Sequence, residues 1–213
     1  YYSTVHGLAL LEGGLNLTAV CADCHGAHGI HPASDERSSL HATKVSATCG
    51  ECHEGIGSLL ESSIHGSAPL VDSLPGDSDV NESSTRNPSC NDCHPGHRML
   101  KTSSDKYRGQ IAGYCGGCHS EMTDSYLMST HGRLTQLGHG PAAKCSDCHG
   151  AHQVLAIDDP RSSLAPGENR LQTCRSCHEN AVVNFSKFDP HADYRNAEQY
   201  PKLHSIYLLT RWV

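Results

Sequence analysis

The sequence predicts a mainly α-helical chain with extensive loops and little regular secondary structure. Only 37% of its 213 residues are hydrophobic and 5% are aromatic, while 20 are Gly and 10 are Pro. This composition is poor in apolar side chains for a conventional core in a chain of this length. No alternation of apolar and polar residues, as in a β-strand, persists beyond a few positions. We therefore expect short helices, long connections and buried apolar surface that side chains alone do not supply.

One short motif uses every cysteine in the chain. Cys-x-x-Cys-His occurs six times, and no cysteine is left over. The cysteines of the six copies are Cys21 and Cys24, Cys49 and Cys52, Cys90 and Cys93, Cys115 and Cys118, Cys145 and Cys148, and Cys174 and Cys177. The histidines that follow them are His25, His53, His94, His119, His149 and His178. In this pattern both thiols form thioether bonds to the edge of a c-type haem, and the adjacent imidazole becomes the proximal ligand of its iron.

Three other uses of paired cysteines fit the sequence less well. Zinc sites bring two Cys-x-x-Cys pairs together and do not require a histidine after each pair. Disulfide scaffolds have varied spacings, and a thioredoxin-like motif occurs once, beside a strand–helix unit that this sequence lacks. The sequence therefore predicts six haem c groups with their iron, and a multihaem cytochrome c wrapped around a haem stack.

The motifs alternate between two types, which divides the chain into repeats. The Asp-containing motifs, at 21–25, 90–94 and 145–149, have Asp before the second Cys and a trailing His three residues after the first His. The Asp-free motifs, at 49–53, 115–119 and 174–178, have neither feature. We expect three di-haem units, 1–53, 54–119 and 120–178, followed by a C-terminal tail, 179–213, that docks on the body or approaches a membrane. An insertion in the middle unit, 71–87, is rich in Ser, Asp, Gly and Pro and is expected to be an exposed loop.

Each unit also contains a His-Gly pair with Ser or Thr two residues before the His. The three copies are 4–7, 63–66 and 129–132, and a degenerate copy, 189–192, reads Asp-Pro-His-Ala. The first and third units further share Arg-Ser-Ser-Leu, at 37–40 and 161–164, nine residues beyond the trailing His. The units are therefore repeats of one design, and equivalent histidines are expected to have equivalent roles.

The chain contains 17 histidines, eleven more than the six proximal ones. Distal ligation of iron by a second imidazole explains this surplus. The repeat nominates six distal ligands, namely the His-Gly histidines His6, His65 and His131 and the trailing histidines His28, His97 and His152. His191 of the degenerate copy and His204 are further candidates, whereas His31, His41 and His139 are expected to contact solvent or haem propionates. Bis-histidine irons have lower reduction potentials than His/Met irons, so low-potential haems are expected.

Charge and sequence pattern narrow the partners and the compartment. The formal charge of −7, to which haem propionates would add, excludes the basic stripe that nucleic-acid binding needs. No secretory signal is present, and because c-type haem is attached outside the cytoplasmic membrane, we expect a processed protein of the periplasm or cell surface. No run of eighteen apolar residues is present. The segment 203–213 is expected to be a docking helix or the approach to a membrane helix, with Arg211 and Trp212 at the interface.

With these motifs the sequence resembles the multihaem c-type cytochromes that carry doubled Cys-x-x-Cys-His motifs. These include periplasmic carriers that supply nitrite and dimethyl sulfoxide reductases, and small cytochromes that polymerise into extracellular filaments. The resemblance covers residues 1–191 and implies haems packed in alternating parallel and perpendicular pairs, close enough for rapid electron hopping. The stretch 188–204 also resembles the segment that joins such domains to a quinone-reactive membrane domain, which implies a quinol-oxidising membrane partner.

Three functional hypotheses follow. The first is an electron carrier without enzymatic activity, which exchanges electrons with redox proteins or terminal electron acceptors. The second is a multihaem reductase for nitrite, tetrathionate or hydroxylamine, which needs one iron with an open position; the histidine surplus and the lack of a Cys-x-x-Cys-Lys variant argue against it. The third is a homopolymer, a filament in which His6 at one end, or His191 and His204 at the other, ligates a haem of the neighbouring molecule.

Overall fold

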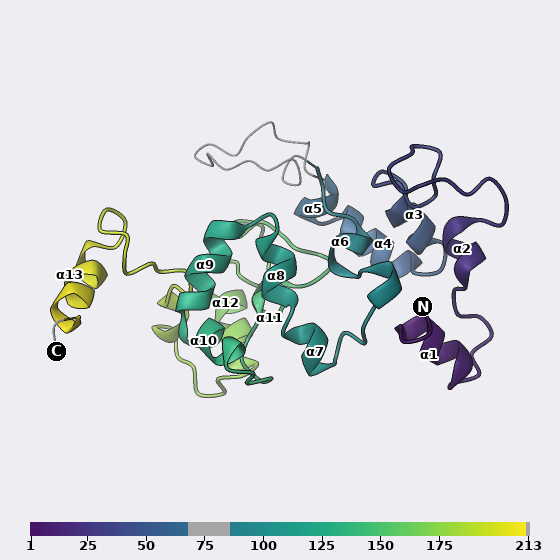
Figure 1. Cartoon of the computed structure of the whole chain (residues 1–213). Coiled ribbons are helices and arrows are strands. Elements are labelled where there is room, and N and C mark those ends of the chain that lie inside the picture. The colour runs from purple at the N-terminus through teal and green to yellow at the C-terminus, as the bar shows by residue number, and fades with distance from the viewer. Residues whose placement is uncertain (68–85, 212–213) are drawn as a thin grey trace.

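The computed structural model describes residues 1–67 and 86–211, and within these ranges the chain is mainly helical with much loop and no β-strand (Figure 1). The expected helical class is confirmed. The insertion expected at 71–87 lies outside the described residues, except for Arg86 and Asn87. The helices are α1 (Val5–Leu11), α2 (Cys21–His25), α3 (Val45–Gly50), α4 (Glu54–Glu61), α5 (Ile64–Ser67), α6 (Cys90–Cys93), η2 (Gly96–Arg98), α7 (Asp105–Arg108), α8 (Ile111–Gly116), α9 (Ser120–Met128), α10 (Thr130–Gln136), α11 (Cys145–His149), α12 (Glu168–Arg175), η3 (Phe185–Lys187) and α13 (Pro201–Thr210).

The body is elongated and follows the order of the chain. Figure 1 shows α2 and α3 at the N-terminal end, α6 in the middle, and α8, α11 and α12 farther along. Helix α13 stands apart at the opposite end, beyond the last motif. None of the helices among residues 1–67 and 86–211 is long and apolar enough to cross a bilayer. The fold therefore places the six motifs along one direction.

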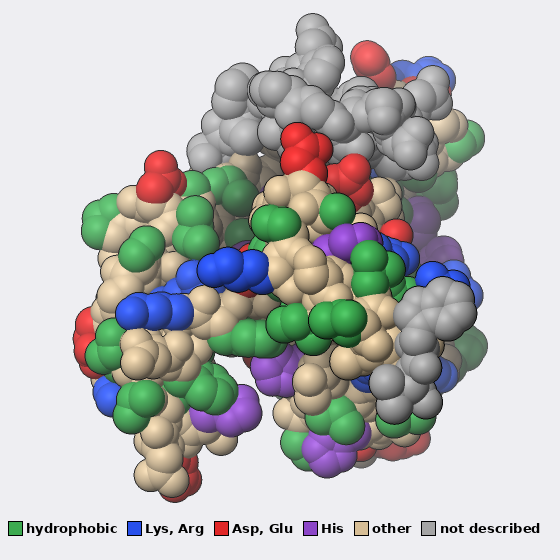
Figure 2. Space-filling view, turned by 90° about the vertical axis from the view of Figure 1, so that its left-hand side faces the viewer, with side chains coloured by type: hydrophobic (Ala, Val, Ile, Leu, Met, Phe, Trp, Pro, Cys, Tyr) green, Lys and Arg blue, Asp and Glu red, His purple; other side chains and the backbone are tan. Residues whose placement is uncertain are grey.

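The side chains do not build a substantial core. The accessible surface is 14534 Å², against the roughly 9,600 Å² expected for a compact monomer of this mass. Of the described hydrophobic residues only eight are buried, and four of those are alanines. Large side chains such as Leu17 and Leu137 remain 90% and 82% exposed, and Figure 2 shows hydrophobic side chains spread over a whole face of the molecule. The polypeptide alone therefore leaves apolar surface uncovered.

The Ser or Thr that precedes each His-Gly pair caps the start of a helix. The Thr4 hydroxyl accepts a hydrogen bond from the Gly7 backbone N–H, and the Ser129 hydroxyl accepts one from Gly132, each at 3.2 Å. The Ser63 hydroxyl accepts a bond from the His65 N–H at 3.2 Å. Such side chains satisfy backbone donors that have no partner within a helix. The cap fixes the first turn, and with it the position of the His-Gly histidine.

The glycine of each His-Gly pair is required by close backbone approach. A Cβ atom on Gly66 would overlap the carbonyl oxygen of Leu60, and one on Gly132 would overlap that of Tyr126. Gly7 meets the backbone of the N-terminal residues in the same way. The end of the preceding segment therefore crosses directly over the helix that carries the histidine. The degenerate copy has Ala192 instead, and there the chain forms a turn rather than a helix.

We expect Gly132→Ala to lower the free energy of unfolding by about 1–3 kcal/mol, because the added methyl group forces a packed backbone crossing apart. Gly113→Ala is the matched control, since a Cβ atom at this exposed helical position meets no other atom within 4 Å. That control should be neutral or stabilise by about 0.5–1 kcal/mol. Thermal unfolding of both variants provides the measurement, and equal transition temperatures would contradict the close approach.

Candidate haem sites

The two motif types have different local structures. Each Asp-containing motif begins a short helix at its first cysteine, namely α2, α6 and α11. Each Asp-free motif instead lies at the C-terminal end of a longer helix, so that Cys49, Cys115 and Cys174 fall in the last turn of α3, α8 and α12. The alternation in the sequence is therefore an alternation between helix starts and helix ends.

The Asp of the first type is a helix cap. The carboxylates of Asp23, Asp92 and Asp147 each accept a hydrogen bond, at 2.7, 2.6 and 2.7 Å, from the backbone N–H of the residue just before the helix. A helix of one turn has little other stabilisation, so this bond fixes its start. Arg86 and Arg108 form two-pronged ion pairs with Asp92 and Asp147. The sequence signal that divided the motifs thus has a structural cause.

Each of the six motif imidazoles lies opposite one other imidazole. The ring centroids are 6.1 Å apart for His53 and His6, 5.9 Å for His25 and His97, 6.2 Å for His119 and His65, 6.2 Å for His94 and His152, 6.1 Å for His178 and His131, and 6.3 Å for His149 and His191. No histidine occurs in two of these pairs. Within the described residues, these six are all of the histidine–histidine ring contacts.

The separation fits coordination of one iron from both sides. With a metal–nitrogen bond of about 2.0 Å and a ring centroid about 1.1 Å behind the nitrogen, two opposed imidazoles have centroids about 6.2 Å apart. A tetrapyrrole supplies the other four ligands of a haem iron, so only two protein ligands are needed. The part of the chain that the structure describes contains no cluster of three or more His, Cys, Asp or Glu side chains that could hold a metal ion.

Burial favours the neutral form of the paired imidazoles. Loss of solvent, and then the opposed imidazole, lowers the pKa of five of these histidines, namely His6, His65, His94, His131 and His149. Neutral imidazole is the form that donates a nitrogen lone pair to a metal. For these five histidines, burial therefore favours the protonation state that ligation requires.

The pairing follows one rule along the repeats. A His-Gly histidine lies opposite the Asp-free motif of its own unit, as His65 does with His119. A trailing histidine lies opposite the Asp-containing motif of the preceding unit, as His152 does with His94. Opposite the Asp-containing motif of the third unit, the tail histidine His191 takes that place. The trailing histidines thus tie successive units together.

Five of the six nominated distal histidines occur in these pairs: His6, His65, His97, His131 and His152. The sixth place is taken by His191, which the degenerate copy had marked as a candidate. His28 is exposed, and no imidazole lies opposite it among the described residues. His204 instead places its Nδ1 3.0 Å from the Tyr194 carbonyl oxygen and packs beside Tyr207.

His191 is oriented by its surroundings as a ligand would be. Its Nδ1 lies 3.0 Å from the Ser125 hydroxyl and 3.2 Å from the Met122 carbonyl oxygen. Donation of the Nδ1 proton to that carbonyl leaves the Nε2 lone pair available, the arrangement by which outer partners orient metal-bound histidines. The Asp189 carboxylate accepts the His191 backbone N–H at 2.9 Å, which replaces the Ser or Thr cap of the other copies.

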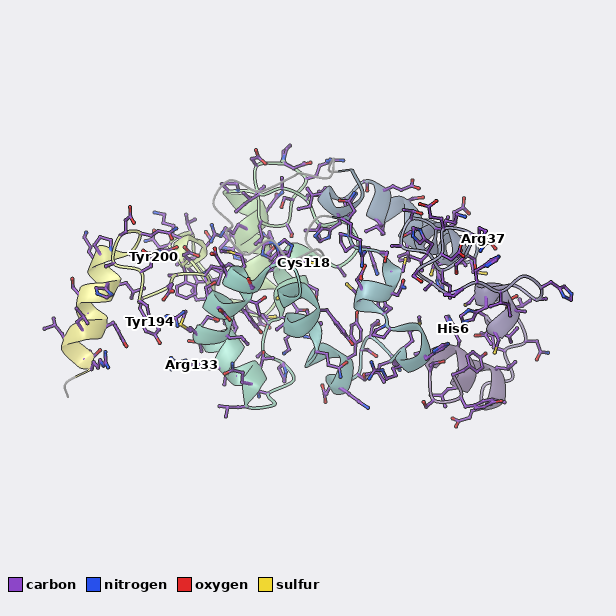
Figure 3. The ribbon with its side chains drawn as sticks, turned by 45° about the horizontal axis from the view of Figure 1, so that its top comes forward. His6, Arg37, Cys118, Arg133, Tyr194 and Tyr200 are labelled. Carbon is purple, nitrogen blue, oxygen red and sulfur yellow. The ribbon has the colours of Figure 1, made fainter. Side chains whose placement is uncertain are left out.

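Thiols of successive motifs lie close together in chain order. A hydrogen bond between the free thiols of Cys49 and Cys90 raises the pKa of Cys49 and lowers that of Cys90, and one between Cys115 and Cys145 raises the pKa of Cys115 and lowers that of Cys145. The remaining neighbours are Cys24 and Cys52, Cys93 and Cys118, and Cys148 and Cys174. In each pair burial raises the pKa of the first thiol, and nearby negative charges, including that of a cysteine of the next motif, raise it further. Figure 3 places Cys118 in the middle of this row, between the N-terminal end at His6 and the tail at Tyr200.

The comparisons with known proteins add no identity. No family model, no curated protein and no solved structure matches this chain. The assignment of the sites therefore rests on the motifs and on the six opposed pairs.

We expect His97→Ala to convert one of six ferric haems from low spin to high spin, because the imidazole opposite His25 is removed. Electron paramagnetic resonance of the oxidised holoprotein measures this as a new high-spin signal equivalent to one haem per chain. His139→Ala serves as the control, since His139 is exposed and lies in no imidazole pair. A wholly low-spin His97→Ala protein would contradict the pairing of His97 with His25.

Proposed function

We propose that this chain is an extracytoplasmic electron conduit that holds six covalently bound c-type haems, each between two histidines. One observation carries the proposal: six motif imidazoles lie opposite six others, one to one, at a distance that fits an intervening iron. The twelve cysteines stand beside the motif imidazoles and supply two thioether bonds for each group. The exposed apolar side chains and the large surface are those of a polypeptide that closes around its cofactors.

The order of the motifs supports transport rather than storage of electrons. Haem iron, when bound, gains and loses single electrons. The chain's part is to fix the spacing: each motif has a thiol near a thiol of the next motif, from Cys24 with Cys52 to Cys148 with Cys174. Groups attached in this way form an unbranched row, so an electron that enters at one end is passed from neighbour to neighbour.

The paired imidazoles also argue for a carrier rather than an enzyme. A reductase of the nitrite, tetrathionate or hydroxylamine type needs a motif imidazole that faces an open position where substrate binds. Each of the six motif imidazoles instead faces another imidazole. Two imidazoles leave no position for substrate and lower the reduction potential relative to a His/Met pair.

The same pairs bear on the partners. Three histidines were nominated for ligation between molecules. Two of them, His6 and His191, each lie opposite a motif imidazole of their own chain, and the third, His204, has its Nδ1 3.0 Å from the Tyr194 carbonyl oxygen. A filament joined by His6 or His191 would have to break an internal pair, which favours a discrete conduit. We propose low-potential redox proteins or terminal acceptors as its partners, in the periplasm or at the cell surface, with a quinol-oxidising membrane protein as an electron source.

The purified holoprotein tests this function directly. Mass spectrometry of the denatured chain should show the added mass of six haems, because thioether bonds survive unfolding. Electron paramagnetic resonance should show only low-spin ferric iron, and redox titration should give potentials below those typical of His/Met haems. Fewer than six haems would contradict the attachment sites, and a high-spin haem in the wild-type protein would favour the reductase.

A further inference from the structure

His28 is the one trailing histidine without an opposed imidazole among the described residues. The other two, His97 and His152, lie opposite the Asp-containing motif of the unit before their own, at 5.9 and 6.2 Å. His28 belongs to the first unit, and none of the three units precedes it. If His28 follows the same rule as the other trailing histidines, it faces the Asp-containing motif of another unit. That motif is not one of the six described above.

The backbone presents His28 in the same way as His152. Both follow a motif helix, α2 or α11, that ends at a glycine with positive φ: Gly26 at 74° and Gly150 at 79°. Only residues without a Cβ atom adopt this conformation freely. The turn that directs the trailing histidine away from its own motif is therefore the same in the first and third units.

The loops behind the two histidines are also held by the same bonds. The Ser39 hydroxyl donates to the Cys24 carbonyl oxygen at 2.5 Å, and the Ser163 hydroxyl donates to that of Cys148 at 2.6 Å. The backbone carbonyl oxygen of each serine in turn accepts a hydrogen bond of 2.7 Å from a threonine hydroxyl, that of Thr48 for Ser39 and that of Thr173 for Ser163. His28 thus occupies the local structure that, in the third unit, supplies a ligand.

A backbone contact between units recurs two residues beyond the trailing histidine. The Val5 N–H donates to the Met99 carbonyl oxygen at 3.0 Å, and the Ile64 N–H donates to that of Val154 at 2.8 Å. Val5 and Ile64 each stand immediately before a His-Gly histidine of the preceding unit. The equivalent acceptor in the first unit is the carbonyl oxygen of Ile30, a residue that is 61% exposed. The first unit therefore repeats both halves of the docking edge, the ligand and the carbonyl.

We propose that His28 is the axial ligand of a seventh haem, carried by a further di-haem unit that docks against the N-terminal end. The inference rests on the proposed function. The proposed partner of His28 is a c-type haem whose iron has one open axial position. The unit that carries this haem would also contain a Ser/Thr-x-His-Gly helix, and the backbone N–H just before its histidine would donate to the Ile30 carbonyl oxygen. Binding forms one bond between an imidazole nitrogen of His28 and iron and releases at most a water, so no oxidant or reductant is needed.

The site is open to such a partner. His28 lines a hollow of about 280 Å³ together with His31, Arg37 and Glu51. Figure 3 shows Arg37, in the loop behind His28, at the N-terminal end of the molecule, far from Tyr194 and Tyr200 at the other end. A di-haem unit docked there would extend the row at that end.

A second copy of the chain fits this place less well than a different di-haem unit. In a head-to-tail pair, His28 would have to reach His149 of the neighbour. His191 already lies opposite His149, held by the Ser125 hydroxyl and the Met122 carbonyl oxygen. Among the described residues, His149 is therefore already paired, whereas His28 lies opposite no imidazole.

The test uses an N-acetylated ferric haem c octapeptide, whose iron has one histidine and one water, added to the oxidised holoprotein. Loss of the high-spin resonance of the octapeptide reports ligation, because low-spin haems of the protein do not contribute to that signal. We expect saturation at one octapeptide per chain for wild type and for the control His31→Ala, which changes a neighbouring imidazole in the same hollow. For His28→Ala we expect at least tenfold weaker binding, and equal binding by His28→Ala would overturn the proposal.

Haem mass and spin state, measured first on each variant, separate this inference from the proposed function. Six low-spin haems in a wild-type protein that does not ligate the octapeptide would overturn the role of His28 alone. Sedimentation without the octapeptide distinguishes the source of the haem. A His28-dependent dimer would assign the seventh haem to a second copy and overturn the choice of a different unit, whereas a monomer supports that choice.

Discussion

The opposition of two imidazoles is the contact on which this architecture depends. The polypeptide buries few large apolar side chains, and its helices are one to three turns long. The histidine pairs join segments 42 to 72 residues apart, the longest span being that of His25 with His97, and do so in a fixed order. In the proposed holoprotein each pair becomes two coordinate bonds through one iron. The units are then held together by ligands at their boundaries, not by a shared core.

This arrangement gives a chemical meaning to small features of the repeat. The Asp of three motifs caps a one-turn helix, and the Ser or Thr before His-Gly caps the helix that brings the second imidazole. The glycine in His-Gly permits a backbone crossing at Gly132 that any side chain would block. These residues act on the backbone that carries the imidazoles. They set the positions of two rings to within the tolerance of a metal–ligand bond.

Much of this was predictable from the sequence, because the spacing of covalently linked residues repeats. The helical class, the motif imidazoles and partners such as His65 and His152 follow from the repeat, and His191 follows from its degenerate copy. The choice between His28 and His191 did not follow. Equivalence along the sequence nominates histidines for pairing, but it does not show which unit each one faces. The partner of a trailing histidine lies in the preceding unit, and this long-range contact is not encoded in the local sequence pattern.

The backward step of the trailing histidines determines how such an array can change in length. A deletion that runs from one Asp-containing motif to the next removes two Cys-x-x-Cys-His motifs. The trailing histidine of the following unit would then take the place of the trailing histidine that was removed. Removal of one attachment site would instead leave an imidazole without its counterpart. Duplication and deletion are therefore tolerated in increments of two, and arrays of this construction are expected to grow and shrink by pairs.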